Sequence, residues 1–288
     1  MSTTVQLTGP EIDALRVALE EEGFEFRALE HAVFQARGEG VVVNAYRSGK
    51  VVVQGKREAE FLARRGWGRV APGRLQGLTV GSDESGKGDY FGPLVVAAVG
   101  VVPGREGELQ DLGVRDSKEM ADSTVLRAAV AVRRSFPHAI RALSPVQYNA
   151  AHEREKNVAL FLSRLHAEAI AEAALAAGGC DRVVIDQFTF SERLEKALRK
   201  EGVEAPVEIR PRAEDNPAVA AASVLARAEF LIGLRESGDE HGLELPKGAG
   251  EPVERMARKI FREGGLPALA QVAKIHFKTT EKVTGLFG

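Results

Sequence analysis

Helical spacing of apolar residues marks the first structural element of the chain. Apolar side chains recur on one face between Ile12 and Leu19, and Gly23 ends the pattern. Thr8 and Glu11 have the spacing of a capping box, in which each side chain hydrogen-bonds to the other residue's backbone. The pattern therefore predicts a helix that begins at Thr8.

Alternation of apolar and polar residues replaces the helical spacing after this helix. The stretches FEFRAL, AVFQARG and VVVNAYRSGKVVVQG alternate with the period of a strand. The last of them contains a turn signal at Arg47-Ser48-Gly49, which predicts a hairpin. A second helix is predicted over Arg57–Arg65. Residues 1–66 are thus expected to form a small α+β module.

The pattern changes again after a Gly/Pro/Arg-rich stretch at 67–77, which we interpret as a linker. In residues 78–288, LTVGSD and GPLVVAAVGVV predict two paired buried strands, RVVIDQF predicts a third that ends on Asp186, and VEIR predicts a short fourth. Helices are predicted in three places: 146–177, from Ser191, and from Asn216 to about Arg235. A mixed sheet flanked by helices is the economical α/β architecture for this part.

Composition narrows the class of protein. The chain has 288 residues, of which 44% are hydrophobic and 28% are charged, as in ordinary soluble proteins. Its single cysteine, Cys180, excludes an internal disulfide and a thiolate metal cluster, so we expect a cytoplasmic protein. The opening MSTTVQLTG lacks the features of a signal peptide, and no apolar run approaches the ~20 residues that span a bilayer.

The net charge of −2 conceals an uneven distribution. Residues 1–36 carry seven acidic and two basic residues, whereas Arg37–Arg74 carries nine basic and three acidic residues. Basic side chains on strands, among them Arg47 and Lys50, suit the phosphate backbone of a nucleic acid. A solvated sheet surface would have the same composition, and both interpretations stay open.

The stretch GSDESGKGDYFGPL, residues 81–94, carries two adjacent acids, Asp83 and Glu84. Its Gly-x4-Gly-Lys pattern matches a P-loop until Gly88, where a P-loop needs a Ser or Thr hydroxyl for magnesium. The two carboxylates would also repel a polyphosphate at close range. Paired acids are better suited to hold divalent cations, which in turn hold a phosphodiester.

Further acids stand at comparable places. Asp186 ends a predicted strand, and Glu214 and Asp215 precede a predicted helix. Carboxylates from three segments, without a His/Cys cluster, favour Mg²⁺ or Mn²⁺ over zinc. Each acid also has a structural interpretation, as a helix cap or as an acid at the start of a helix. A Ser-His-Asp hydrolase is disfavoured because the sequence has no Gly-x-Ser-x-Gly elbow.

Six segments together resemble the ribonuclease HIII family over about residues 78–282: DESGKGDYFGPL, DSKEM, VVIDQF, AVAAASVLAR, LPKGAG and KIHFKTTEK. The first module also resembles the TATA-box-binding-protein-like domain that this family places before its catalytic domain. The resemblance implies a ribonuclease H-like fold and endonucleolytic cleavage of the RNA strand in RNA/DNA hybrids. The expected products carry 5'-phosphate and 3'-hydroxyl ends.

The resemblance also implies site residues. The family's catalytic, metal-binding acids fall on Asp83, Glu84, Asp186 and Glu214, with Asp215 as a rival for the last position and Mg²⁺ or Mn²⁺ as cofactor. The turn Gly86-Lys87-Gly88 is expected to touch the RNA strand, where glycines let backbone amides approach a 2'-hydroxyl. Further candidate contacts, each equally explained by surface solvation, are Ser117, Lys118, Lys247, Lys274 and Lys278. Polar residues interpreted as structural are Asn149, Asn157 and His166.

We therefore expect a two-domain, metal-dependent enzyme that acts as a monomer on RNA/DNA hybrids, with no membrane partner. The alternative is a non-catalytic hybrid-binding protein. Related ribonucleases HII recognise a single embedded ribonucleotide with a C-terminal tyrosine and a Gly-Arg-Gly turn. The tyrosines here, Tyr46, Tyr90 and Tyr148, all precede the second catalytic strand, and the turn contains Lys87. Poor cleavage at single ribonucleotides is expected, unless Phe188, Phe261 or Phe277 replaces that tyrosine.

Overall fold

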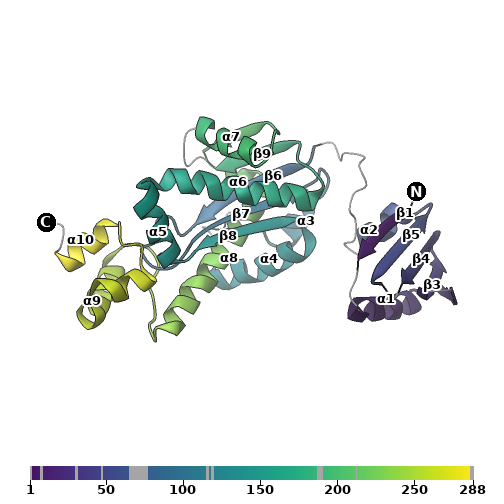
Figure 1. Ribbon diagram of the computed structural model, residues 1–288, viewed down its shortest axis with the longest axis horizontal. Helices are drawn as coiled ribbons and strands as arrows, with labels where there is room; N and C mark the ends of the chain where they lie inside the picture. Colours follow the sequence, from purple (N-terminus) through teal and green to yellow (C-terminus); the bar gives the residue numbers. More distant parts are fainter. Residues whose placement is uncertain are drawn as a thin grey trace. The chain divides into compact units, whose positions relative to one another are not determined.

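In the computed structural model, the chain forms two compact units, Met1–Arg74 and Leu75–Gly288 (Figure 1). The structure describes residues 2–6, 9–29, 32–46, 48–64, 77–114, 117, 120–186, 191–211 and 213–285. Apart from Gly77, the predicted linker at 67–77 lies outside these residues, and so does Thr8, the predicted start of the first helix.

The first unit is built on a five-stranded antiparallel sheet with the order β1-β5-β4-β3-β2. Its elements are β1 (Ser2–Gln6), α1 (Gly9–Glu21), β2 (Glu25–Arg27), β3 (Ala32–Gly38), β4 (Val41–Tyr46), β5 (Lys50–Gly55) and α2 (Glu58–Arg64). The strand β1 was missed by the sequence analysis. Its sequence STTVQ has one large apolar residue, and it lies at the sheet edge, where it pairs with β5.

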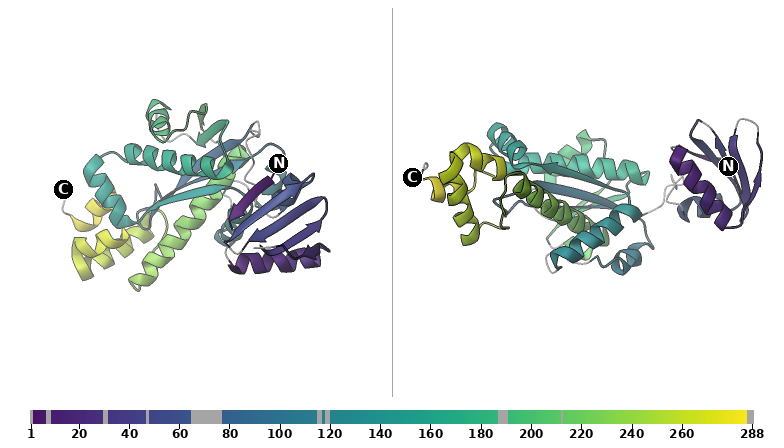
Figure 2. Two further views of the ribbon diagram at one scale, coloured as in Figure 1. Left: turned by 45° about the vertical axis from the view of Figure 1, so that its right-hand side comes forward. Right: turned by 90° about the horizontal axis from the view of Figure 1, so that it is seen from below.

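The two faces of this sheet differ. Alternate apolar residues face α1 and α2 and form one core with them, including Val43, Val53, Leu19 and Phe61. Figure 2 shows α1 lying along that face. The opposite face carries the polar residues Gln35, Arg37, Lys50 and Gln54, beside Val42, Val52 and the buried Asn44. We call the four polar residues the open face. Among the described residues of this unit, no helix packs over it.

The second unit contains a mixed sheet, as the sequence predicts, with five strands in the order β10-β9-β6-β7-β8. The strand β8 was not predicted from the sequence. Strands β6, β9 and β10 are parallel, whereas β7 is antiparallel to both of its neighbours. The strands are β6 (Thr79–Ser85), β7 (Leu94–Val101), β8 (His138–Leu143), β9 (Arg182–Asp186) and β10 (Val207–Arg210). The helices are α3 (Glu106–Asp111), α4 (Asp122–Ser135), α5 (Pro145–Glu155), α6 (Val158–Ala177), α7 (Ser191–Lys200), the 3₁₀ turn η2 (Ala213–Asp215), α8 (Pro217–Glu240), α9 (Glu251–Val272) and α10 (Lys278–Thr284).

Helices cover both faces of this sheet (Figures 1 and 2). On one side, Val95, Ala97 and Val99 of β7 share a core with α4 and α8. On the other side, the intervening residues of β7 pack against α5, α6 and α7. This double burial explains why GPLVVAAVGVV is continuously apolar, unlike the alternating strands of the first unit.

Two predicted helices differ from the structure. The single helix predicted over 146–177 is divided, because Lys156 adopts a left-handed conformation (φ 49°) and Asn157 caps the start of α6. The last long helix begins as predicted, with Asn216 accepting a hydrogen bond from the Ala218 N–H, but it extends to Glu240.

Helix α8 is long and apolar enough to cross a membrane by length and composition, contrary to the sequence analysis. Within that apolar stretch, 67% is buried inside the protein, where the helix contacts β6, β7 and α4. The helix is therefore a core element of the second unit.

Candidate active site

Two neighbouring strand ends bring the predicted acids together. In the parallel pairing of β6 and β9, Ser82 lies opposite Ile185, so the next residues, Asp83 and Asp186, are neighbours at the carboxyl ends of the strands. The Ala213 N–H donates to Asp186 Oδ1 at 3.3 Å. This contact draws η2, which carries Glu214, toward the same end of the sheet.

Close packing of α8 beneath β6 depends on Gly81. A Cβ atom at this position would lie 2.3 Å from Ala218 C and from Val219 N, closer than real Cβ contacts allow. Gly81 therefore belongs to a strand that needs close helix contact, and it is not part of a phosphate-binding loop. The P-loop-like pattern is thus explained by packing.

Asp83 is buried and acidic. Its side chain is 6% exposed, and its Oδ1 accepts the Glu84 N–H at 2.8 Å. Burial, reinforced by the charge of Glu84, raises the pKa of Asp83 to about 7, although a hydrogen bond from Ser223 acts in the opposite direction. An ionised Asp83 thus lacks sufficient compensation from the protein alone.

Glu84 has different surroundings. Its Oε1 accepts from Lys87 Nζ at 3.1 Å, and its Oε2 lies 3.3 Å from His166 Nε2. Burial opposes ionisation of Glu84, but His166 and Lys87 together outweigh it and lower the pKa of this carboxyl. His166 Nδ1 lies 2.8 Å from Ser82 Oγ, which also donates to the Ala97 carbonyl at 2.8 Å. His166 was interpreted from the sequence as a structural residue, and its contact with Glu84 was not predicted.

The strand period separates these two acids. Consecutive strand residues point to opposite faces, and accordingly Asp83 contacts Ser223 of α8 whereas Glu84 contacts His166 of α6. Within the described residues, no three His, Cys, Asp or Glu side chains lie close enough to hold one metal ion together. The donor set nonetheless fits a hard divalent cation, because carboxylate oxygens are its preferred ligands and a cation would offset the burial of Asp83.

Glu214 and Asp215 are distinguished by their surroundings. Asp215 is 69% exposed in an ion pair with Arg210, which lowers the pKa of Asp215. Glu214 is half-buried on η2. Of the two acids, Glu214 is thus the more buried, whereas Asp215 is exposed and paired with Arg210.

A cleft of about 270 Å³ opens at this end of the sheet. Its lining residues are Asp83, Glu84, Ser85, Asp89, Ser117, Ser223, Arg227, Phe230, Leu231 and Lys247. The structure thus places two predicted contacts, Ser117 and Lys247, beside two of the predicted acids.

A hydrogen-bond network supports this cleft. Ser117 Oγ lies 2.8 Å from Ser223 Oγ, and because Ser223 donates to Asp83, Ser117 is the donor. Arg227 donates to the Ser117 carbonyl and to Asp122 Oδ1, the latter at 2.9 Å. Lys247 Nζ donates to Asp122 Oδ2 at 2.6 Å.

Three members of this network, Asp122, Ser223 and Arg227, were not selected from the sequence. The AVAAASVLAR segment contained Ser223 and Arg227, so it was a usable signal for both.

The glycine turn beside the acids has two different glycines. Gly86 has φ +85°, and a Cβ there would lie 2.1 Å from the Pro93 carbonyl oxygen, so glycine is required. Gly88 has an ordinary backbone conformation, and a Cβ there would meet no atom within 4 Å. No packing constraint inside the protein therefore explains Gly88.

The remaining residues that were predicted to contact nucleic acid lie in different parts of the structure. Arg47 and Lys118 lie outside the described residues. Lys50 is exposed on the open face of the first unit, and Lys278 is exposed at the start of α10. Lys274 is fully buried, so the suggestion that it contacts phosphate is wrong.

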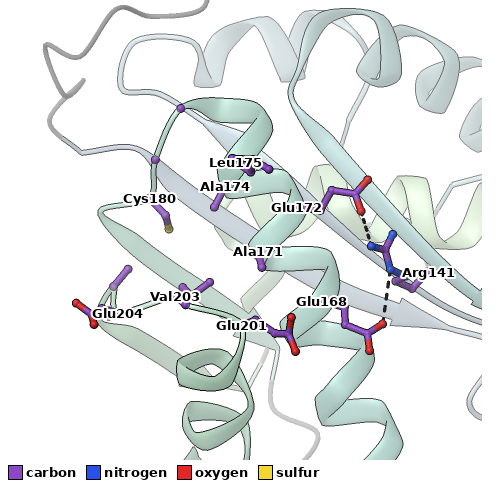
Figure 3. Close-up of a pocket in the computed structure, with 14 residues that line it drawn as sticks. Arg141, Glu168, Ala171, Glu172, Ala174, Leu175, Cys180, Glu201, Val203 and Glu204 are labelled. Carbon is purple, nitrogen blue, oxygen red and sulfur yellow. Dashed lines mark hydrogen bonds and ion pairs between the residues drawn. The ribbon is translucent and has the colours of Figure 1, made fainter.

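A larger cavity, of about 920 Å³, lies at the opposite end of β9 (Figure 3). It is bordered by Cys180, Leu175 and Val203, and the cation in its wall, Arg141, is paired with two glutamates, Glu168 and Glu172. None of the predicted site residues lines it, so size does not identify the candidate active site.

Two family models match the chain, one in each of its two units. A family model described as Ribonuclease HII matches residues 80–280, and one described as a domain of unknown function (DUF3378) matches residues 4–76. Ribonuclease HIII of Protochlamydia amoebophila is 35% identical over 279 residues, covering 94% of this chain and 92% of that protein. Ribonuclease HIII of Chlamydia muridarum is 36% identical over 293 residues, covering 97% and 96%. The crystal structure of Bst-RNase HIII in complex with Mn²⁺ has a TM-score of 0.68 at 32% identity and covers 99% of both chains.

Proposed function

Because the chain belongs to the ribonuclease HIII family, we propose that it cleaves the RNA strand of RNA/DNA hybrids internally and leaves 5'-phosphate and 3'-hydroxyl ends. The observation that carries this proposal is the buried carboxyl of Asp83, whose pKa is raised to about 7, beside Asp186 at neighbouring strand ends. A divalent cation would offset the cost of ionising such a buried acid, and a cleft that combines cations with acids suits a phosphodiester.

The proposed ligands of Mg²⁺ or Mn²⁺ are Asp83, Glu84, Asp186 and Glu214. When bound, two divalent cations would help to activate water and to stabilise the charge on the scissile phosphate. Ser223 orients Asp83, and His166 and Lys87 orient Glu84. Their role is to hold the carboxylates in place before substrate arrives.

Substrate recognition is assigned to the turn at 86–88 and to the far wall of the cleft. Gly88 has open space around it, which leaves room for a ribose to approach the backbone. Lys87 is 44% exposed and adds positive charge beside the turn. Ser117 and Lys247 face the same cleft and are the proposed backbone and phosphate contacts.

The first unit is proposed to increase the affinity of the enzyme for the RNA/DNA hybrid. Lys50 and Arg37 are exposed on the open face, and Arg47 follows β4 in the sequence. Basic and amide side chains on an uncovered sheet suit a nucleic-acid backbone, whose binding comes chiefly from phosphate neutralisation. We propose that the enzyme acts in the cytoplasm as a monomer.

The decisive test is cleavage of an end-labelled RNA/DNA hybrid with Mg²⁺ or Mn²⁺. Internal cuts that disappear with EDTA are expected, while single-stranded RNA and duplex DNA of the same sequence stay intact. A protein that binds the hybrid but never cuts it in either metal would refute the proposed activity. End-group analysis of the products checks the 5'-phosphate and 3'-hydroxyl assignment.

The proposed substrate preference concerns the length of the RNA stretch. Tyr90 and Tyr148 are fully buried, so neither is available to stack on a nucleotide at an RNA-to-DNA junction. Lys87 also lacks the planar donor fork of an arginine. We expect slow cleavage at a single ribonucleotide in duplex DNA and faster cleavage within four or more. The preference would be contradicted by comparable cleavage rates on two duplexes of equal length, one with a single ribonucleotide and one with four or more. Stacking of Phe261 or Phe277 on the nucleotide at the junction would also contradict it. Phe188, the third candidate, lies outside the described residues.

A further inference from the structure

Lys274 is a fully buried lysine whose ammonium donates hydrogen bonds to three backbone carbonyls. Its Nζ donates to the carbonyls of Asp89 at 2.8 Å, Gly92 at 2.6 Å and Phe91 at 3.4 Å. An ammonium has three N–H donors, so three carbonyls match its capacity. The side chain therefore joins the C-terminal segment to the loop that follows the glycine turn.

Keeping an ammonium in this position is costly. Burial lowers the pKa of Lys274 to about 7, with the nearby Asp89 acting in the opposite direction. An apolar side chain would fill the same space without that cost. Because only the ammonium can hold three carbonyls at once, its presence indicates that the position of this loop matters.

The backbone around Lys274 follows the same loop. The Lys274 N–H donates to the Tyr90 carbonyl at 2.9 Å, and the Gly92 N–H donates to the Val272 carbonyl at 3.1 Å. Phe91 and Ala273 form an antiparallel bridge between these two bonds. Residues 272–274 therefore run alongside residues 90–92.

Both sides of this pairing are anchored elsewhere. Asn149 of α5 donates to the Ala273 carbonyl and accepts from the Ile275 N–H, at 2.9 and 3.1 Å. The Gly248 N–H donates to Asp89 Oδ1 at 2.6 Å. The backbone on both sides of Lys274 is therefore held in place by Asn149.

The pinned loop leads directly into the glycine turn. The Asp89 N–H donates to the Gly86 carbonyl at 3.3 Å, which closes the turn at 86–88. Gly86 in turn packs against the Pro93 carbonyl oxygen at the far end of the loop. A displacement of residues 89–92 would therefore move Gly88 and Lys87.

We propose that Lys274 is a positioning residue, which holds the carbonyls of 89, 91 and 92 so that the turn at 86–88 is preformed for the RNA strand. The inference rests on the proposed function for its substrate. Its structural half, that Lys274 rigidifies residues 86–92, stands without that function. Lys274 touches no substrate and acts through the loop.

The test compares Lys274→Met with Lys259→Met in the full-length protein. Lys259 is exposed on α9, so its variant removes the same charge without touching the loop. For Lys274→Met we expect faster amide hydrogen exchange in residues 86–92 and a KM for the hybrid raised by about tenfold, with a smaller change in kcat. Lys259→Met should match the parent protein in both measurements.

Unchanged exchange in residues 86–92, or an unchanged KM despite faster exchange, would overturn the inference. If Lys274→Met does not fold, Lys274→Gln serves instead, because its amide offers two N–H donors in place of three and so weakens the hold on the three carbonyls. It should accelerate exchange in the same residues and raise KM to a lesser extent. A parent protein that fails to cut hybrids would refute the proposed function, while the exchange measurement would still decide the role of Lys274.

Discussion

The two sheets of this protein use the same elementary structure in different ways. The sheet of the second unit is covered by helices on both faces, and its functional side chains gather where β6 and β9 end. The sheet of the first unit has helices on one face, and its polar side chains spread over the other.

Covering one face or both faces of a sheet determines which kind of functional site the sheet can form. A doubly covered sheet is rigid, and its strand ends can hold carboxylates within a small cleft, as catalysis requires. An uncovered face presents many exposed groups over a broad area, which suits weak contacts along a polymer. Changes at the strand ends should therefore affect turnover, whereas changes on the open face should affect affinity.

The largest effect is expected for Asp83→Asn and Asp186→Asn. Each variant removes a charge with little change in volume, so cleavage should fall by at least about 10³-fold while hybrid binding is retained. Single-turnover cleavage and filter binding measure the two quantities. Asp239→Asn, at an exposed position of α8, is the matched control and should behave like the parent. Near-parental turnover of a folded Asp83→Asn protein would remove the basis for the site.

The pair Glu214→Gln and Asp215→Asn separates the two candidates for the fourth acid. Asp215 is exposed and paired with Arg210, so its variant should change turnover little. Glu214→Gln should reduce turnover by about 10²-fold at saturating metal. The reverse order of effects would assign the role to Asp215.

A smaller loss is expected for Gly88→Ala. Because a Cβ at this position meets no protein atom and the backbone conformation is ordinary, the fold should be unaffected. If a ribose approaches this backbone, the added methyl group should raise KM by about tenfold. Gly107→Ala in α3, where a Cβ also meets no atom, is the control. Equal KM values for the two variants would argue against contact at Gly88.

Variants of the open face should reduce affinity by a few-fold without changing kcat. In the double variant Arg37→Ala with Lys50→Ala, the logarithm of hybrid affinity should fall less steeply with the logarithm of salt concentration. The slope should be smaller by up to about two, because each lost phosphate contact contributes about one. Arg16→Ala combined with Arg57→Ala removes two exposed charges outside this face. Deleting residues 1–75 should weaken binding further. Identical salt slopes for both double variants would favour a merely solvated surface.

A separate effect concerns stability without metal. Because the pKa of Asp83 is raised to about 7 in the folded protein, the native state binds more protons than the unfolded state above pH 4, so stability should fall as pH rises toward 7. Asp83→Asn removes this loss and should be more stable than the parent in EDTA at pH 8, on the order of 4 kcal/mol, because the shift is about three pKa units at about 1.4 kcal/mol each. Denaturant unfolding of both proteins at pH 5 and pH 8 measures this difference in the free energy of unfolding. A loss of equal size in both proteins would contradict the account of Asp83.

Some of these features follow from contiguous residues. The alternation in AVFQARG and the continuous apolar run of GPLVVAAVGVV predicted a half-covered strand and a doubly buried strand, and the structure contains both. The position of Asp83 and Asp186 after apolar runs predicted acids at strand ends. Such patterns are readable because strand periodicity is a property of neighbouring residues.

Tertiary structure decided the remaining features, because they depend on residues far apart in the chain. The contact of Lys274 with the Asp89 carbonyl joins positions separated by 185 residues, and no local pattern distinguishes a buried lysine from an exposed one. The role of Gly81 required the approach of α8, and the difference in surroundings between Asp215 and Glu214 required the pairing of Asp215 with Arg210. The sequence by itself determined which side chains stand at the strand ends. Packing determined which face each acid takes and what holds it there, since burial and hydrogen bonding arise only when distant segments meet.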